Sequence, residues 1–204
     1  AAQGLIAGIN AALSLKKIEP FILDRSDAYI GVMIDDLVTK GVAEPYRMFT
    51  SRAEYRLSLR SDNADLRLTH KGINIGLILN NRKEIFEDKF QKLSKISLQM
   101  SNLNISPSKA SKFGIKIAKD GVFRTAEEIL TQKDVNMSKI RDIWPEILNH
   151  GAEIDEQIEI NSHYRGYLKK QKADILAFKR DENLSIPDNI DYDQFSGLSN
   201  EVKA

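Results

Sequence analysis

A stripe of apolar residues with helical spacing in the middle of the chain constrains the fold most strongly. It follows the pair Asn80 and Asn81 and consists of Phe86, Phe90, Leu93, Ile96, Met100 and Leu103. Residues spaced three or four apart share one face of an α-helix, so the stripe predicts a long helix with one buried side. A strand alternates with a period of two and does not produce this pattern.

Several further segments carry the start, stop and periodicity signals of helices. They are expected at residues 1–17, at residues 28–40 with Asp24 and Ser26 as caps and Gly41 as the stop, from Thr69 to about Gly76, after a capping box from Thr125 to Glu128, through Met137 to Ile147, from Glu153 to Asn183 with a break or bend near Gly166, and from Ser199 onward. The sequence therefore predicts a mainly α fold with at most one or two short strands.

Four arginines and a single acid occupy residues 47–60, although the whole chain of 204 residues has a net charge of only +1. We call residues 47–60 the arginine-rich segment; its arginines are Arg47, Arg52, Arg56 and Arg60. Each guanidinium has five donors suited to phosphate, and Tyr46, Phe49 and Tyr55 offer rings on which a base or a flavin can stack. The alternation from Glu54 to Arg60 predicts a short half-buried strand, with a turn near Ala53.

A structural role for these arginines is the alternative. In that interpretation they form ion pairs with nearby acids, namely Glu44, Glu54, Asp62 and Asp65. The residues alone do not decide between phosphate binding and such a network.

Two other stretches are candidate binding sites. In the first helix, Gln3, Gly4 and Gly8 would leave backbone N–H groups open to a close planar or phosphorylated ligand, although tight helix packing explains the small residues equally well. Residues 163–180 hold six lysines and arginines and one acid, which is typical of a solvated face and also fits a binding face.

The composition excludes several kinds of chemistry. Without cysteine there are no disulfides, thiolate metal ligands or cysteine nucleophiles, and three scattered histidines argue against a zinc site. No apolar run has the length of a membrane span, so we expect a cytoplasmic protein. Because the chain starts without Met inside a predicted helix, we expect it to be a piece of a longer protein.

Several motifs resemble one family in order along the chain. They read AAQGLIAGINAAL, then YIGVMIDDLVTKGVAEPYRMFTSRAEYRLSLRSDNADLRLT, and downstream YRGYLKKQ, IPDNIDY and GLSNEV. This set resembles the C-terminal part of the glucose-inhibited division protein A family, the tRNA uridine 5-carboxymethylaminomethyl modification enzymes. Only residues 78–145 lack a strong signature.

The resemblance implies a function for the full-length protein. Members bind FAD, use NADH and methylenetetrahydrofolate, and work as homodimers with a GTPase partner, MnmE, on carbon 5 of the wobble uridine of tRNA. It implies that Gln3, Gly4 and Gly8 meet the flavin. The tRNA contacts it implies are Arg47, Arg52, Arg56, Arg60, Arg67, Lys71, Lys169 and Lys170.

The resemblance also implies a division of the chain. Residues 1–68 would be the end of the FAD-binding domain with its last helix and a connecting segment, and residues 69–204 a helical C-terminal domain truncated at its end. The phosphate-binding loop, the NADH-binding insertion and the family's cysteines are missing, so we expect no catalytic residue here and an inactive chain that holds FAD poorly.

Two rival interpretations stay open at the level of the sequence. One is a non-enzymatic helical interaction module with structural arginines. The other is a related flavoprotein that methylates tRNA uridine with folate, which we rank last because it is expected to lack the long helical extension.

Overall fold

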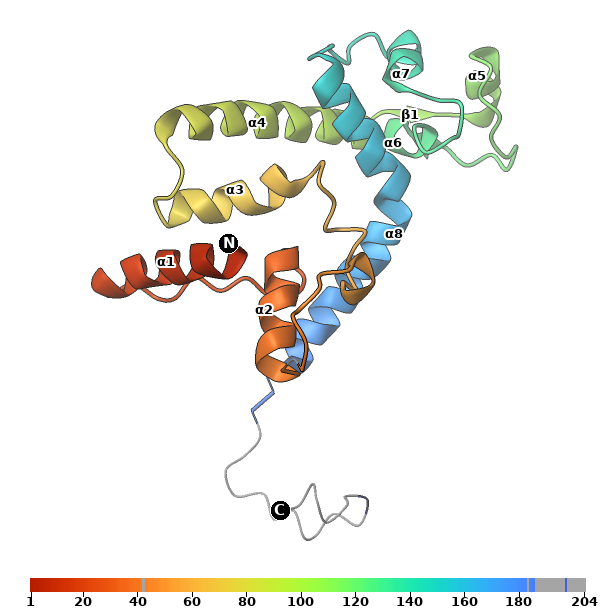
Figure 1. Cartoon of the computed structure of the whole chain (residues 1–204). Helices are drawn as coiled ribbons and strands as arrows, with labels where there is room; N and C mark the ends of the chain where they lie inside the picture. The colour runs from red at the N-terminus through yellow and green to blue at the C-terminus, as the bar shows by residue number, and fades with distance from the viewer. Residues whose placement is uncertain (42, 183, 186–196, 198–204) are drawn as a thin grey trace.

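A computed structural model describes residues 1–41, 43–182, 184–185 and 197 of the chain. The helix predicted from Ser199 onward lies outside these residues. In Figure 1 the helices form an open arrangement rather than a sphere, with α4 across the top, α1 and α2 below it, and α8 running between the two levels.

Helices dominate the described residues, as the sequence predicts. The elements are α1 (Ala2–Leu15), α2 (Tyr29–Thr39), the 3₁₀ turn η1 (Thr50–Arg52), α3 (Ala64–Asn74), α4 (Asn80–Asn102), β1 (Asn104–Ile105), α5 (Pro107–Lys112), β2 (Arg124–Thr125), α6 (Ala126–Ile129), α7 (Met137–Ile143) and α8 (Ala152–Glu182). The predicted mainly α fold class is confirmed.

The larger core lies where α4 meets α6, α7 and the start of α8. Ile96 and Met100 of the apolar stripe are fully buried there, and Ile154 and Ile158 of α8 belong to the same cluster. The predicted capping box is present, because Thr125 and Glu128 each accept a hydrogen bond from the other's backbone N–H. The residue before α6 also belongs to β2, which pairs antiparallel with β1 over two residues.

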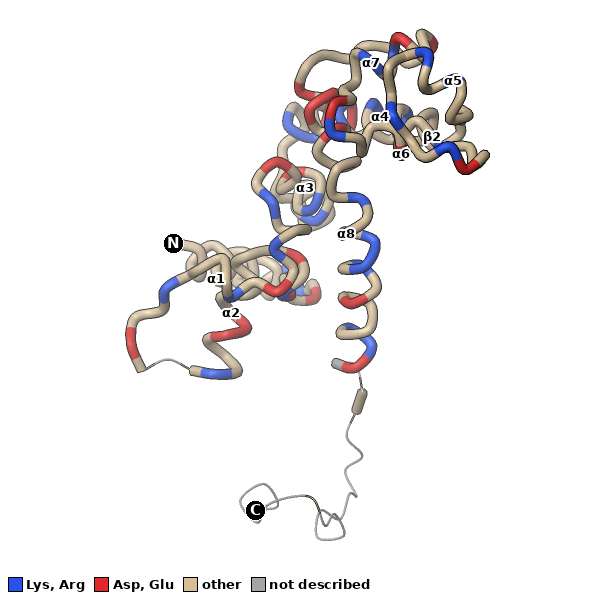
Figure 2. Tube along the Cα trace, turned by 90° about the vertical axis from the view of Figure 1, so that its right-hand side faces the viewer, with Lys and Arg blue, Asp and Glu red and all other residues tan. Residues whose placement is uncertain are grey.

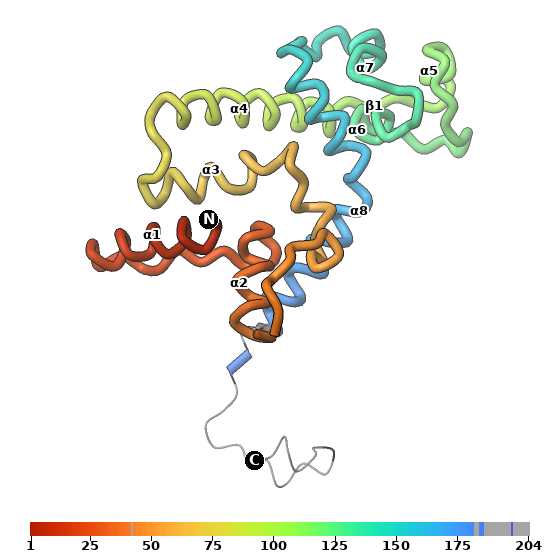
Figure 3. Tube along the Cα trace, viewed as in Figure 1, coloured from red at the N-terminus to blue at the C-terminus, as the bar shows by residue number. Residues whose placement is uncertain are grey.

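The longest helix, α8, connects the two levels of the molecule. Its 31 residues begin beside α7 and extend down past α3 toward α2, as the tube in Figure 3 shows. The predicted break near Gly166 was wrong, since the helix continues through this residue without interruption, while the alternative, a bend there, stays a prediction. A single glycine costs a helix about 1 kcal/mol, which the surrounding turns can outweigh.

A smaller core lies under the arginine-rich segment. Val32 of α2 packs there with Ala53 and Leu59, and Tyr29 covers them. The predicted caps of α2 were wrong, because its N-cap is Ala28, which has no side-chain cap. Asp24 instead accepts hydrogen bonds from the backbone N–H groups of Ser26 and Asp27, one turn before the helix.

Two other predictions about local structure were wrong. The backbone from Glu54 to Arg60 forms turns, in which the N–H groups of Ser58 and Leu59 both bond to the carbonyl of Tyr55. Among the described residues no strand pairs with it, and the two short strands, β1 and β2, lie elsewhere in the chain. Thr69 does not cap a helix but lies buried inside α3. The division of the chain at residues 68 and 69 stays a prediction.

Neither a membrane span nor a metal cluster is found among the described residues. No helix there combines the length and the apolar character that crossing a membrane requires. In the same part of the chain, no group of three or more His, Asp or Glu side chains is placed to hold a metal ion.

Candidate nucleic-acid interface

A buried arginine organises the site, and it is one that sequence reasoning missed. The guanidinium of Arg25 donates to Asp36 at 2.7 Å, to Asp35 at 2.8 Å and to Glu54 at 2.6 Å. It also donates to the backbone carbonyl of Arg52 at 3.0 Å. Because these partners come from α2 and from the arginine-rich segment, Arg25 joins the two.

Asp36 is the second centre of this network and is only 2% exposed. Although burial by itself raises the pKa of a carboxyl group, hydrogen bonds from Arg25, Lys40 and Tyr46 hold the pKa of Asp36 well below its usual range. The carboxylate is therefore ionised, and it places a fixed negative charge directly beneath Tyr46 and Arg52.

Tyr46 and Arg52 form a pair above this carboxylate. The Tyr46 hydroxyl donates to Asp36 at 2.9 Å, and the Arg52 guanidinium lies 4.9 Å from the centre of the Tyr46 ring. One Arg52 nitrogen is 3.5 Å from Asp36. A cation over an aromatic face is attracted to it, so both side chains are held in one orientation.

A hollow of about 560 Å³ opens in front of this pair. It is lined by Ala43, Glu44, Pro45, Tyr46, Arg47, Phe49 and Arg52. Arg47 is exposed and makes no hydrogen bond or ion pair with any residue that the structure describes, and the same holds for Arg56 outside the hollow. Within the described part of the arginine-rich segment, these two guanidinium groups have no partner in the chain and can bind an external anion.

Arg60 and Arg67 instead have their donors engaged within the chain. Arg60 makes two hydrogen bonds to Asp62, one to Asn161 of α8, and lies 4.8 Å from the ring centre of Tyr164. Arg67 donates to Asn63 and to the backbone carbonyls of Asp27 and Arg60. The structural alternative therefore holds for these two, and their contact with tRNA stays a prediction.

The remaining predicted tRNA contacts fall into two groups. Lys71 forms an ion pair with Asp27 at 3.1 Å and is half-buried. Lys169 and Lys170 are exposed on α8, a helix along which Figure 2 shows several blue segments. These two lysines share α8 with Arg165, which is 3.2 Å from Glu127 of α6.

Helix α8 fastens the arginine-rich segment from the other side. Ser58 donates to Gln171, and Tyr55 contacts Phe178 edge-to-face at 6.3 Å between ring centres. The segment is thus fixed both by α2, through Arg25, and by α8.

The predicted flavin residues lie apart from this site on α1. Gln3, Gly4 and Gly8 are exposed, and a Cβ at either glycine would meet nothing within 4 Å among the described residues. The helix is attached in its second half, where the Asn10 side-chain amide accepts from and donates to the backbone of Phe21. The structure does not bring these three residues together with the arginine-rich segment.

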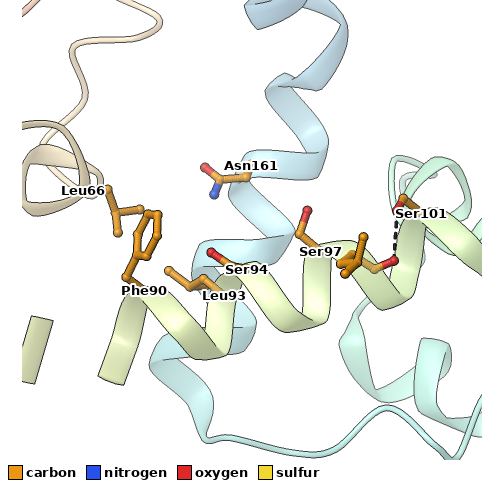
Figure 4. Close-up of a pocket in the computed structure, with 8 residues that line it drawn as sticks. Leu66, Phe90, Leu93, Ser94, Ser97, Ser101 and Asn161 are labelled. Atoms are coloured by element: carbon orange, nitrogen blue, oxygen red, sulfur yellow. Dashed lines mark hydrogen bonds between the residues drawn. The ribbon is translucent and has the colours of Figure 1, made fainter. Parts of the chain in front are cut away.

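Another hollow, of about 430 Å³, lies between α3, α4 and α8 (Figure 4). Leu66, Phe90 and a row of serines line it, with Asn161 opposite them. None of its described lining residues carries a charge, so it offers little to a phosphate backbone. We therefore place the candidate interface at the arginine-rich segment.

Comparison with known proteins places this fold in one class. The family model described as "tRNA modifying enzyme MnmG/GidA C-terminal helical domain" matches residues 80–172. The model described as "tRNA modifying enzyme MnmG/GidA C-terminal helical bundle" matches residues 174–204. The fold is thus that of the helical domains of tRNA modifying enzymes.

Individual relatives agree with this assignment. The tRNA uridine 5-carboxymethylaminomethyl modification enzyme MnmG of Caldicellulosiruptor saccharolyticus is 48% identical over 206 residues, and the match covers 100% of this chain and 33% of the relative. The enzyme of the same name from Listeria monocytogenes is 46% identical, with 99% and 33% covered. A solved structure of Aquifex aeolicus GidA superposes with a TM-score of 0.76 at 34% identity, covering 100% of this chain and 32% of that one.

The chain belongs to the MnmG/GidA family. It spans about a third of the length of the relatives that it matches.

Proposed function

We propose that this chain is the tRNA- and partner-binding portion of an FAD-dependent enzyme that, with a GTPase partner, installs the carboxymethylaminomethyl group on carbon 5 of the wobble uridine of tRNA. The observation that carries the proposal is a pair of exposed arginines, Arg47 and Arg56, which have no partner among the described residues and lie on a segment held by a buried ion network. Membership of the MnmG/GidA family supports it.

The arginines divide into two roles in this proposal. Arg47, Arg52 and Arg56 contact phosphates, because their guanidinium groups reach solvent with donors to spare. Arg60 and Arg67 support the segment from inside, an assignment favoured by their bonds to Asp62 and to the Arg60 carbonyl, while Lys71 is paired with Asp27 outside the segment. Lys169 and Lys170 form a second, weaker patch on α8.

The open face of α1 is where this chain would meet the flavin. Gly4 and Gly8 leave the helix backbone accessible, and Gln3 at its first turn offers an amide, so the residues present fit a planar ligand. Bound FAD would supply the redox chemistry, with NADH and methylenetetrahydrofolate as co-substrates. The GTPase partner, MnmE, and a second copy of the chain complete the proposed assembly, which we expect in the cytoplasm.

Salt dependence tests the phosphate contacts. Arg47→Ala and Arg56→Ala in the full-length protein should each weaken tRNA binding and lower the slope of log affinity against log salt by about one unit per contact, with an unchanged melting temperature. Arg82→Ala is the matched control, since Arg82 is an exposed arginine on α4 that has no partner among the described residues.

An unchanged salt slope in both variants would reject the proposal. Arg47 and Arg56 would then be solvated surface residues, and the chain would be better described as a helical interaction module.

A further inference from the structure

The hollow in front of Tyr46 has the features of a site for a single nucleotide. We propose that it binds one unpaired nucleotide of an RNA, with the base against Phe49 and the adjoining phosphate on Arg47 and Arg52. This rests on the proposed function and goes beyond it, because it assigns a defined pocket and a stacking residue to an interface otherwise argued from charge alone.

Arg52 is pre-oriented for such a phosphate. Its guanidinium is stacked on Tyr46, and a single nitrogen approaches Asp36, at 3.5 Å. The side chain is 42% exposed, so its remaining donors face solvent at the hollow. Since Asp36 is itself fixed by Arg25, the ligand does not have to order this arginine on binding.

Phe49 supplies the stacking surface. Its side chain is 54% exposed although it is among the most apolar in the chain, and it lines the hollow beside Arg47. One face of Tyr46 is already covered by Arg52, which leaves Phe49 as the aromatic ring available in this hollow. Stacking on an aromatic ring tolerates every base, because each base has a π face.

Glu44 distinguishes this hollow from a plain anion site. Its carboxylate lines the same space and has no hydrogen-bond or ion-pair partner within the described ranges. A carboxylate disfavours inorganic phosphate but accepts N–H groups, which the hydrogen-bonding edges of nucleobases provide. The combination of two guanidinium groups, one ring and one carboxylate therefore matches a nucleotide better than phosphate alone.

The test uses RNA hairpins with 2-aminopurine placed at each loop position in turn. The full-length protein should change the fluorescence of the probe at one loop position. Phe49→Ala should abolish this change and weaken hairpin binding about tenfold, the typical effect of removing one stacked base. A duplex of the same length, which has no unpaired base, should bind the variant and the unsubstituted protein equally.

Phe123→Ala is the matched control, because Phe123 is also an exposed phenylalanine and lies beside β2, outside the hollow. It should change neither readout. If Phe49→Ala keeps the probe response and the affinity, the nucleotide site is rejected, while the salt-slope experiment still decides the proposed function separately. If Phe49→Ala lowers FAD retention and leaves the probe response intact, the hollow belongs to a flavin and the proposal is likewise overturned.

Discussion

Arg25 and Asp36 form a hydrogen-bonded ion pair at 2.7 Å in which both side chains are more than nine-tenths buried. One partner lies just before α2 and the other in its third turn, and the pair also connects to Glu54 and to the Arg52 carbonyl. The position of the arginine-rich segment therefore depends on a charge pair that solvent does not reach.

Removing the arginine should destabilise the protein strongly. Arg25→Met leaves Asp36 without its main partner, and breaking a buried pair in this way typically costs about 3–5 kcal/mol. Urea unfolding followed by circular dichroism measures this cost. Lys92→Ala, which removes an exposed pair with Asp88 inside α4, should cost less than about 1 kcal/mol. Equal costs for the two variants would show that the buried network contributes little.

Stability should fall in acid partly through Asp36. Hydrogen bonds from Arg25, Lys40 and Tyr46 keep the pKa of Asp36 in the folded protein below the pKa of an Asp in the unfolded chain, which is about 3.9. The stability that Asp36 contributes is therefore fully present above that pH and is lost as the pH falls further. Asp36→Asn should be less stable at pH 7, and its stability should change less between pH 5 and pH 3. Parallel stability curves for the two proteins would exclude Asp36 as a source of the acid sensitivity.

Replacing each of two glycines by alanine should change the stability of the protein in opposite directions. A Cβ on Gly31 of α2 would lie 2.1 Å from the backbone carbonyl oxygen of Asp24, so Gly31→Ala should destabilise by about 1–3 kcal/mol or more. A Cβ on Gly166 meets nothing within 4 Å among the described residues, so Gly166→Ala should stabilise α8 by about 0.5–1 kcal/mol. Thermal melting of both variants gives the comparison, and a stable Gly31→Ala would contradict the close approach of the two segments.

Alanine substitutions at Arg60 and Arg52 should separate effects on stability from effects on tRNA binding. The Arg60 side chain is 11% exposed and bonded to Asp62 and Asn161, so Arg60→Ala should lower stability by about 1–3 kcal/mol, and its loss of tRNA binding should follow its unfolding. Arg52→Ala should leave the melting temperature nearly unchanged while lowering affinity and salt slope. The Lys169→Ala/Lys170→Ala double variant should have the weaker effect on binding. The division of roles fails if Arg52→Ala melts as early as Arg60→Ala.

The open face of α1 leads to a prediction about flavin. In the full-length protein, Gln3→Ala combined with Gly4→Val should weaken FAD retention, because the valine side chain blocks close approach to the backbone. Ala11→Val, an exposed small-to-branched change on the same helix, is the control. Absorbance of purified protein near the flavin bands measures retention, and undiminished flavin in the double variant would remove these residues from the site.

The features of the fold that depend on local residue spacing were predictable from the sequence. The stripe from Phe86 to Met100 and the capping box at Thr125 depend on residues at most four apart, and local spacing is what periodicity reports. The prediction of a strand from Glu54 to Arg60 was wrong because alternation also arises in consecutive turns. Leu59 is buried there beside Val32, and no described strand pairs with it.

The centre of the candidate site was not predictable in the same way. Arg25 is a single arginine among acids, and its partner Glu54 is 29 residues away, so no local pattern signals their contact. Likewise, sequence alone does not separate Arg60, which bonds to Asn161 across 101 positions, from Arg56, which has no partner in the part of the chain that the structure describes. Which arginines are engaged follows from how α8 packs, and packing at that range has no signature in a single sequence.

Because α8 is one unbroken rod of 31 residues, about 45 Å long, the larger core and the arginine-rich segment cannot move independently. Near its start α8 is bonded to Lys89 through Glu153, and near its end to Asp24 through Lys179. Pivoting the rod by about 5° at the core would displace its far end by about 4 Å, which exceeds the length of a hydrogen bond. A protein that binds at the α4–α7 end and tilts α8 would therefore also displace the arginine-rich segment.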